Sequence, residues 1–401
     1  MSIMYLADNV SSDGTVYPTI GEHIRAGNKE LDKLKEDIDS LKREFCDVIS
    51  IGAKGDGVTD DSEIIQFALN NYDNVFLPFT EKGYAISKPL VITKPRTTLS
   101  GANKLPYFIT SEKPLKGSCI IPTTSFSGRA LIVIPHESYG CNIKNISLSN
   151  DYTNVKCTGL EIGYSEKSYT GLESLGYHTI KDVMIYKMNG VGIFFHYKCW
   201  DNYVENVSVK KCSTGFQIEC TDSVFAGCYA SSNTNNGFIV KYGANSLVSC
   251  KAFFNGTVGQ SLTAGFVLEE KGYHTRMIGC NSQQNKTNGV RISTSTNVVT
   301  GLVCDGNGYN NPNNYNSALI IEKGGNIIES VMIIPHWLGG CVRYGINIKA
   351  DITNIVVGAI IKEIYTDEEI QENFKNWHNF VNTSPTTSGN NNSIEINCNK
   401  I

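Results

Sequence analysis

A repeat of short alternating segments fills the middle of the chain and restricts its fold more than any other feature. Segments of about five residues with period two, repeated without helices between them, are typical of a β-solenoid. We therefore predict a parallel β-helix whose equivalent strands stack about 4.8 Å apart. The repeated segments are "GIFFH" from Gly192, "GFQIE" from Gly215, "GFIVK" from Gly237, "GFVLE" from Gly265, "GVRIS" from Gly289, "ALIIE" from Ala318 and "GINIK" from Gly345.

A second alternating segment lies between these strands, and one position in it is always cysteine or aliphatic. Because a β-helix stacks like residues on like, we expect an inward column there, followed by an asparagine ladder with amides bonded from coil to coil. A leucine-rich repeat would need a Leu/Asn consensus that is missing, and a propeller blade needs about 40–45 residues. The column is Val207, Cys228, Cys250, Cys280 and Leu302, and the ladder is Asn233, Asn255, Asn285 and Asn307.

The 13 cysteines include no Cys-x-x-Cys pair, and most of them lie in apolar runs such as "VFAGCYA". Disulfide frameworks belong to short secreted chains, so we expect reduced cysteines that pack as small core residues. Disulfides and zinc ligation are the alternatives.

The stretch "GAKGDGVTDDSEIIQFAL" at 52–69 is dense in glycine and aspartate and leads into an apolar-periodic helix. It lacks the Gly-Lys-Ser/Thr of a P-loop and the twelfth-position glutamate of an EF-hand. We predict that Asp60 is the N-cap and that Glu63 completes a capping box, so that the stretch is architectural. A chance cation site and a catalytic loop are the alternatives.

Residues 19–45 predict an amphipathic helix that begins with a capping box at Thr19 and Glu22. Apolar residues from Leu31 to Phe45 follow two heptads, with charged residues between them. We predict a short parallel coiled coil that joins three chains. A single helix packed on the solenoid is the alternative.

Three segments, "ISIGAKGDGVTDDSEIIQFAL", "NVFLPFTEKGYAISKPLVI" and "TTLSGANK", resemble the start of pectate-lyase-superfamily right-handed β-helices, above all those of bacteriophage tailspikes and capsule depolymerases. The motifs cover residues 46–105, and the repeat extends the resemblance to about 362. The resemblance implies an all-β, right-handed parallel β-helix that forms a homotrimer. It also implies a phage tailspike that binds and cleaves host surface polysaccharide by hydrolysis or β-elimination. A non-catalytic glycan-binding tail fibre or adhesin is the alternative.

The resemblance also gives the expected organisation of the chain. Residues 1–18 would be a virion-attachment arm that binds a phage tail or baseplate protein, and 19–45 the coiled-coil helix. Residues 46–105 would form the N-terminal cap with the strands that lead into the solenoid, and 106–365 the β-helix. Residues 366–401 would hold a C-terminal cap helix, a linker and a strand, "SIEINC", that could pair with a neighbouring chain. The protein would be made in the host cytoplasm and act in the virion outside the cell.

Alternation along the glycine-type strands places one column of polar residues on the outside. Glu219 and Glu269 stand two coils apart, near the spacing of about 6.5–9.5 Å found in inverting glycosidases, and are our candidate catalytic pair. Lys241 between them would hold a carboxylated sugar, and His196 would act as the base of a lyase. The alternative is a sign-alternating charge ladder. The whole column is His196, Glu219, Lys241, Glu269, Ser293, Glu322 and Lys349.

A second outward face carries aromatic and polar residues. Sugar rings stack their C–H faces on aromatic rings, so Tyr186, Tyr229, Phe253 and Asp305 are candidate substrate-binding residues. A subunit interface of the trimer is the alternative. The outward apolar residues Ile239, Val267 and Ile320 would likewise need a partner surface.

Several functions are disfavoured by what the sequence lacks. With 39 acidic against 35 basic residues, the chain has no basic excess for nucleic acid. No apolar run reaches the roughly 20 residues of a membrane-spanning helix. The arginine motif of pectate lyases, His-Glu-x-x-His and Gly-x-Ser-x-Gly are all missing. We expect no metal and no cofactor.

Overall fold

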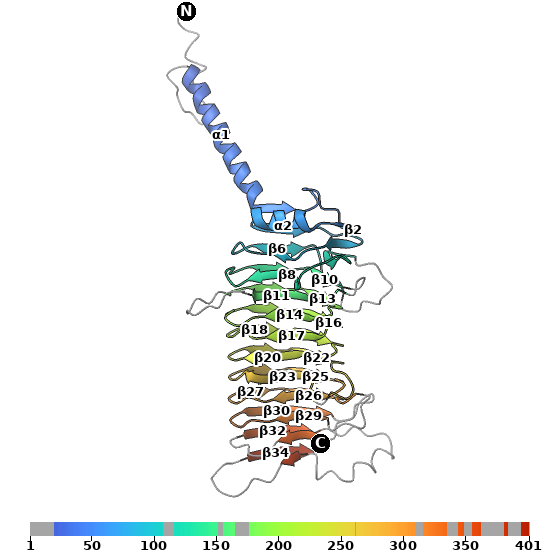
Figure 1. Cartoon of the computed structure of the whole chain (residues 1–401). Helices are drawn as coiled ribbons and strands as arrows, with labels where there is room; N and C mark the ends of the chain where they lie inside the picture. The colour runs from blue at the N-terminus through green and yellow to red at the C-terminus, as the bar shows by residue number, and fades with distance from the viewer. Residues whose placement is uncertain are drawn as a thin grey trace, which may run out of the picture.

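The computed structural model describes residues 20–106, 116–150, 155–164, 176–260, 262–309, 316–334, 344–348, 355–361, 381–383 and 394–400. The chain forms a solenoid of stacked coils, with one helix, α1, projecting from its N-terminal end (Figure 1). Within the described residues, all pairing between named strands is parallel and forms two sheets, one of 11 strands (sheet 1) and one of 23 strands (sheet 2). The parallel β-helix is confirmed.

Sheet 1 supplies one strand to each coil. Its strands are β5 (Leu90–Val91), β8 (Ala130–Pro135), β11 (Thr158–Tyr164), β14 (Val191–Phe195), β17 (Thr214–Ile218), β20 (Phe238–Tyr242), β23 (Ala264–Lys271), β26 (Asn288–Ile292), β29 (Ser317–Ile321), β31 (Tyr344–Ile348) and β33 (Val381–Thr383).

Sheet 2 supplies two short strands to most coils. Its strands are β1 (Phe45–Asp47), β2 (Asp56–Asp60), β3 (Asn74–Leu77), β4 (Gly83–Ile86), β6 (Thr98–Gly101), β7 (Cys119–Pro122), β9 (Asn142–Lys144), β10 (Ser147–Ser149), β12 (Thr179–Lys181), β13 (Met184–Tyr186), β15 (Tyr203–Glu205), β16 (Ser208–Lys210), β18 (Val224–Ala226), β19 (Tyr229–Ser231), β21 (Ser246–Val248), β22 (Lys251–Phe253), β24 (Arg276–Ile278), β25 (Asn281–Gln283), β27 (Val298–Thr300), β28 (Val303–Asp305), β30 (Ile327–Ile334), β32 (Ile355–Ile361) and β34 (Ile394–Lys400).

The interior is built from columns of like residues, as the repeat predicts. Phe216, Phe238 and Phe266 stack from coil to coil with ring centroids 4.4 and 4.9 Å apart. The predicted column of cysteine and aliphatic residues is buried throughout. The eleven cysteines whose side chains the structure describes are all free thiols, and all are buried. Cysteine therefore serves here as a small core residue.

The asparagine ladder is present at the corner between sheet 2 and sheet 1. Asn233 Nδ2 donates to Asn255 Oδ1 (2.8 Å), and Asn255 Nδ2 donates to Asn285 Oδ1 (2.9 Å). The ladder also explains the glycine at or next to the start of four successive strands of sheet 1, β17, β20, β23 and β26. A Cβ atom at Gly237 would lie 2.9 Å from Asn255 Nδ2 and 2.5 Å from the carbonyl oxygen of Gly265. No larger residue fits there without moving the ladder.

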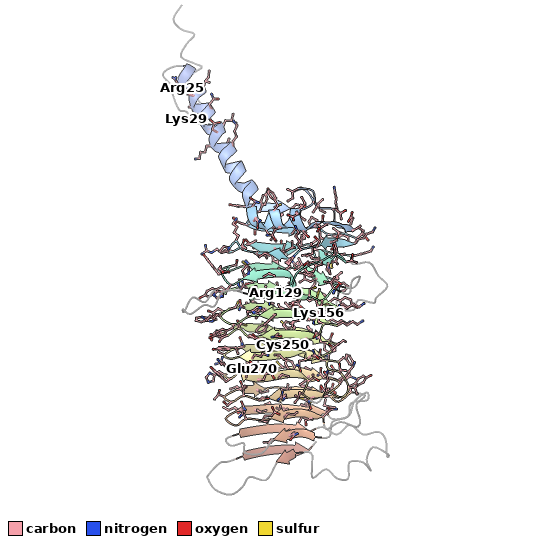
Figure 2. All side chains as sticks on the ribbon, in the orientation of Figure 1. Arg25, Lys29, Arg129, Lys156, Cys250 and Glu270 are labelled. Atoms are coloured by element: carbon pink, nitrogen blue, oxygen red, sulfur yellow. The ribbon has the colours of Figure 1, made fainter. Side chains whose placement is uncertain are left out.

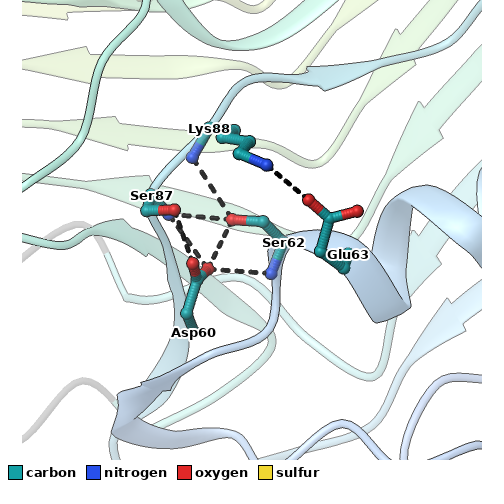
Figure 3. Close-up of polar contacts among 5 residues, drawn as sticks. All are labelled: Asp60, Ser62, Glu63, Ser87 and Lys88. Atoms are coloured by element: carbon teal, nitrogen blue, oxygen red, sulfur yellow. Dashed lines mark hydrogen bonds and ion pairs between the residues drawn. The ribbon is translucent and has the colours of Figure 1, made fainter.

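The stretch at 52–69 leads into a helix as predicted, but its capping differs from the prediction. Helix α2 (Ser62–Asn71) begins after Asp61, which is the N-cap and makes no side-chain cap hydrogen bond. Asp60 instead accepts hydrogen bonds from Ser62 and Ser87, while Glu63 pairs with Lys88 (Figure 3). The Asp60–Glu63 capping box is therefore wrong, because Asp60 lies one residue before the cap and ties the helix to the 87–88 loop.

The two aspartates at this helix differ in burial. The Asp61 carboxylate is buried and accepts hydrogen bonds from the backbone N–H groups of Lys54 (2.7 Å) and Gly55 (3.0 Å). Burial raises the pKa of Asp61, and these two hydrogen bonds oppose the rise. Burial would also raise the pKa of Asp60, but the hydrogen bonds from Ser62 and Ser87 outweigh it and lower the pKa to about 2. Both side chains hold the loop that leads into α2.

The structure describes only some of the segments that were predicted at the two ends of the chain. Helix α1 (Ile20–Glu44) matches the predicted helix and points away from the solenoid, so the packed-helix alternative is not what forms (Figure 1). The C-terminal strand β34 pairs with β32 of the same chain, and its pairing with a neighbouring chain stays a prediction. The predicted attachment arm at 1–18 and cap helix at 366–381 lie outside the described residues, except for Val381, which begins β33.

Candidate functional site

The outer face of sheet 1 brings the predicted polar column together. Phe195 pairs with Ile218, and Ile218 with Val240, so His196, Glu219 and Lys241 follow one another on successive coils. Glu269, Ser293 and Glu322 continue the column in the same way. Lys349 lies outside the described residues.

His196 does not simply pair along this column but reaches to the preceding coil. Its Nε2 atom lies 2.6 Å from Oε1 of Glu161, whose side chain is only 2% exposed. The residue of that coil equivalent to His196 is Gly163, which has no side chain to obstruct this reach. The imidazole also stacks on Phe194, with ring centroids 3.9 Å apart, so two contacts fix its orientation.

Arg129, the residue immediately before β8, completes this group. Its Nε atom lies 2.6 Å from Glu161 Oε2, and its guanidinium covers the ring of Tyr164 at 3.6 Å from the centroid. The Arg129–Glu161 contact is an ion pair without hydrogen-bond geometry, because Glu161 Oε2 has no hydrogen-bond partner. We call Arg129, Glu161, Tyr164 and His196 the Glu161 cluster.

The Glu161 cluster has the geometry of an acid–base group. When the proton is on Nε2, His196 donates it to the buried carboxylate, and Nδ1 keeps a lone pair that accepts a proton. A carboxylate in this position fixes the tautomer and stabilises the imidazolium that forms. The histidine remains 18% exposed, so a proton donor in solvent can reach it.

The column beyond Glu219 is mainly a network of ion pairs. Lys241 Nζ bonds Glu270 (3.0 Å), because a bulge in β23 sets two glutamates opposite one lysine. Burial would lower the pKa of Lys241, but the hydrogen bond to Glu270 and the charges of Glu219 and Glu269 raise it. Glu219 accepts a hydrogen bond from Gln217 at 2.7 Å. Figure 2 shows Arg129 of the Glu161 cluster and Glu270 of this network at different levels of the solenoid.

Arg291 joins the far end of this network. Its NH1 atom lies 3.7 Å from Glu269 Oε2, and its NH2 atom lies 2.8 Å from Glu322. Glu269 thus stands between Lys241 and Arg291, as the alternative of a charge ladder requires.

The second predicted face lies on sheet 2 and consists of two columns. Tyr186, Phe253 and Asp305 belong to one, while Tyr229 belongs to the other. Tyr186 points away from the main core but is completely buried against Leu105 and neighbours, so the expectation of an accessible ring is wrong. Asp305 is 9% exposed, and burial raises its pKa, with Lys251 opposing. Tyr229 is 37% exposed, and Phe253 is partly exposed.

The outward apolar residues of sheet 1 need less covering than expected. Val267 and Ile320 are 1% and 7% exposed within the single chain, because neighbouring side chains on the sheet surround them. They therefore do not form the open face that we inferred from alternation, and Ile239 alone of the three is partly exposed.

The sequence reasoning missed Arg129 and Glu161. One signal was present, since "GLEIG" from Gly159 fits the repeated pattern one coil before the first segment we used. Its glutamate occupies the position that holds Phe194 and Gln217 in the next two coils. No comparable signal marks Arg129, because only the folded backbone brings it beside Glu161.

Among the described residues, no group of three or more His, Cys, Asp or Glu side chains is arranged to hold a metal ion. Within the same residues, no helix has the length and apolar character needed to span a bilayer.

Comparison with solved structures returns parallel β-helix proteins. The A-module of the Azotobacter vinelandii mannuronan C-5 epimerase AlgE6 aligns with a TM-score of 0.63 and 16% identity, over 88% of this chain and 98% of that one. The enzymatically active domain of bacteriophage CBA120 tailspike protein 2 gives 0.62 and 13%, over 80% and 48%. Geobacillus virus E2 ORF18 gives 0.59 and 18%, over 82% and 64%.

The chain therefore spans about half of the CBA120 tailspike domain and under two thirds of the Geobacillus virus protein. At these identities the comparisons show a shared fold. No protein-family model and no curated protein matches the chain.

Proposed function

We propose that this protein is a phage tailspike that binds a bacterial surface polysaccharide and cleaves it at the Glu161 cluster. The observation that carries the proposal is the buried Glu161 carboxylate bonded to a partly exposed histidine on the outer face of a parallel β-helix. The fold is shared with a bacteriophage tailspike and with a mannuronan C-5 epimerase.

In this mechanism His196 accepts a proton through Nδ1 while Glu161 holds Nε2–H. The proton comes from an attacking water in hydrolysis, or from a sugar carbon beside a carboxylate in β-elimination. The charge of Glu161 stabilises the imidazolium in either case. Glu219, on the next coil, is the nearest predicted carboxylate along the column and is the candidate second group, with Glu269 and Lys241 beyond it.

The test is incubation of the purified full chain with capsules from a panel of bacteria. New reducing ends together with absorbance near 235 nm would indicate β-elimination, and reducing ends alone would indicate hydrolysis. The Glu161→Gln variant should lose either signal while it stays folded. Cleavage at the wild-type rate by that variant would contradict the assignment to this cluster.

A second candidate function is binding without cleavage, as in a tail fibre or adhesin. It is favoured by the ion pairs of Lys241 with Glu270 and of Arg291 with Glu322, which engage much of the column in the single chain. Retention of the protein on a capsule without any new reducing ends would select this function.

We also propose that α1 joins three copies of the chain and that residues 1–18 attach the trimer to a phage tail or baseplate protein. The apolar residues Ile24, Leu31 and Leu34 on the projecting helix are each more than half exposed, which a coiled coil would remedy. Light scattering should give three times the chain mass of 44.0 kDa. A stable monomer at micromolar concentration would contradict the trimer.

A further inference from the structure

A group of exposed tyrosines lies at the corner that follows sheet 1. Tyr197 is 50% exposed and Tyr273 is 39% exposed. The rings of Tyr197 and Tyr242 lie 4.8 Å apart between centroids and are tilted by 53°. These residues come from different coils, and Tyr197 and Tyr242 come from coils that are not adjacent. The coil between them places the small residues Cys220 and Thr221 after its own strand, which leaves room for the two rings to meet.

The hydroxyl group of Tyr242 stays in its neutral, hydrogen-bonding form. The Tyr242 hydroxyl donates to the Tyr197 oxygen at 3.5 Å. This hydrogen bond, with a smaller contribution from burial, raises the pKa of Tyr242 to about 12. The phenol therefore stays protonated near neutral pH and is suited to hydrogen bonding rather than to proton abstraction.

Cationic and aromatic neighbours surround the rings. Lys271 Nζ lies 5.6 Å from the centroid of Tyr242, and Lys198 Nζ lies 6.0 Å from that of Tyr197. The His274 ring meets Tyr273 edge-on at 5.0 Å. Tyrosine rings with hydroxyl and ammonium groups at their edges are suited to sugars, whose C–H faces are apolar and whose hydroxyls form hydrogen bonds.

The tyrosine group is also continuous with the candidate site. Tyr197 directly follows His196 in the chain, and Tyr242 directly follows Lys241. A polysaccharide that crosses the outer face of sheet 1 at His196 therefore meets these rings with a neighbouring sugar unit.

We propose that Tyr197, Tyr242 and Tyr273 form a subsite that binds one pyranose ring of the polysaccharide, next to the unit held at His196. This subsite rests on the proposed function for its substrate, and it differs from the sheet 2 face that the sequence suggested. It makes Tyr197 and Tyr242 affinity residues, whereas the Glu161 cluster governs turnover.

The experiment compares full-length wild type with the double variant Tyr197→Ala/Tyr242→Ala. On a capsule that the wild type degrades, KM should rise on the order of tenfold, because two stacking faces are lost, with kcat within about threefold. The double variant Tyr197→Phe/Tyr242→Phe keeps both rings and should stay within about threefold of wild-type KM. Tyr203→Ala is the matched control, since Tyr203 is 43% exposed on sheet 2 and should leave both constants unchanged.

Retention of the same variants in native gels that contain the capsule separates this inference from the proposed function. Retention of the wild type with weak retention of the alanine double variant supports the subsite. Equal retention of both overturns the subsite alone, as does a phenylalanine double variant as weak as the alanine one. A wild type that is neither retained nor active on any capsule overturns the proposed function, and the subsite with it. Thermal melting confirms that each variant is folded.

Discussion

The corner that holds the asparagine ladder and the outer face that holds Glu161 both bury polar groups, but in opposite ways. In the ladder each amide repeats in register, and Asn255 donates to Asn285 while it accepts from Asn233. Glu161 occurs in one coil only, is just as buried, and leaves Oε2 without a hydrogen bond. His178 is another such single residue, with Nε2 unpaired.

The difference separates architecture from candidate chemistry. A repeated polar residue satisfies its neighbours above and below, so its burial costs little and it stabilises the stack. A single buried charge has no such partners and persists only where other groups hold it. Substitutions that break the repeat should lower the free energy of unfolding, and substitutions of Glu161 should lower the rate of turnover.

The largest expected effect is on turnover in Glu161→Gln. Glutamine keeps the size of glutamate but removes the charge that stabilises the His196 imidazolium, so kcat should fall by about 10²–10⁴. Initial rates on a degradable capsule measure this. Glu322→Gln, in the same column but within the Arg291 network, is the control and should turn over within about threefold of wild type. Equal losses of turnover in the two variants would mean that the buried charge of Glu161 matters no more for catalysis than the Arg291 network does.

The next effect is on folding in Asn255→Ala. The backbone N–H and the side-chain amide of Asn233 both lose their acceptor, Asn255 Oδ1, whereas Asn285 Oδ1 keeps the backbone N–H of residue 255. At about 2 kcal/mol each, the free energy of unfolding should fall by about 4 kcal/mol. Denaturant titration measures it, and the folded variant should keep wild-type turnover. Asn307→Ala removes the acceptor of the Asn285 backbone N–H, but Asn285 Nδ2 keeps Ala252 O and Ser282 Oγ, so this variant should cost about half as much. Equal costs for the two variants would argue against the ladder as the source.

The stability of the fold should depend on pH through His178. This residue lies one coil before Asn202 and occupies the equivalent position. Its Nδ1 accepts from the Cys141 N–H, and burial lowers its pKa from 6.5 to about 4. A lowered pKa contributes stability above pH 6.5 that is lost as the pH falls toward 4, by about 3 kcal/mol. Unfolding free energies at pH 7 and pH 4.5 measure the loss. In His178→Asn the part of the loss due to this residue should disappear. An unchanged pH dependence would exclude His178 as its cause.

The smallest effects are expected at the entrance to α2. Asp60→Ala should cost about 1 kcal/mol, as the loss of a helix-terminal hydrogen-bond acceptor usually does. Asp61→Ala should cost about 2 kcal/mol, because two backbone N–H groups lose their acceptor. Turnover should be unchanged in both. A folded variant of either kind without cleavage activity would mean that the stretch belongs to the site after all.

The same contrast explains how far the sequence could predict this molecule. The Cys column, the asparagine ladder and the position of His196 beside Glu219 all follow from repetition, because equivalent residues must stack. Glu161 and Arg129 could not be paired in advance, since their contact joins the middle of one strand to the residue immediately before another. Tyr186 was misjudged because alternation gives the direction of a side chain, while the covering by Leu105 comes from a distant loop.

The ladder also determines where this protein can vary. Asn233 and Asn255 are 22 residues apart, Asn255 and Asn285 are 30, and Asn285 and Asn307 are again 22, yet the amide bonds are alike. A longer loop in one coil is thus accommodated without loss of register between the strands. Surface loops can lengthen, shorten or change composition between related chains while the stack beneath them is preserved. Under the proposed function, insertion in these loops would alter the surface that contacts a glycan and leave the folding of the solenoid untouched.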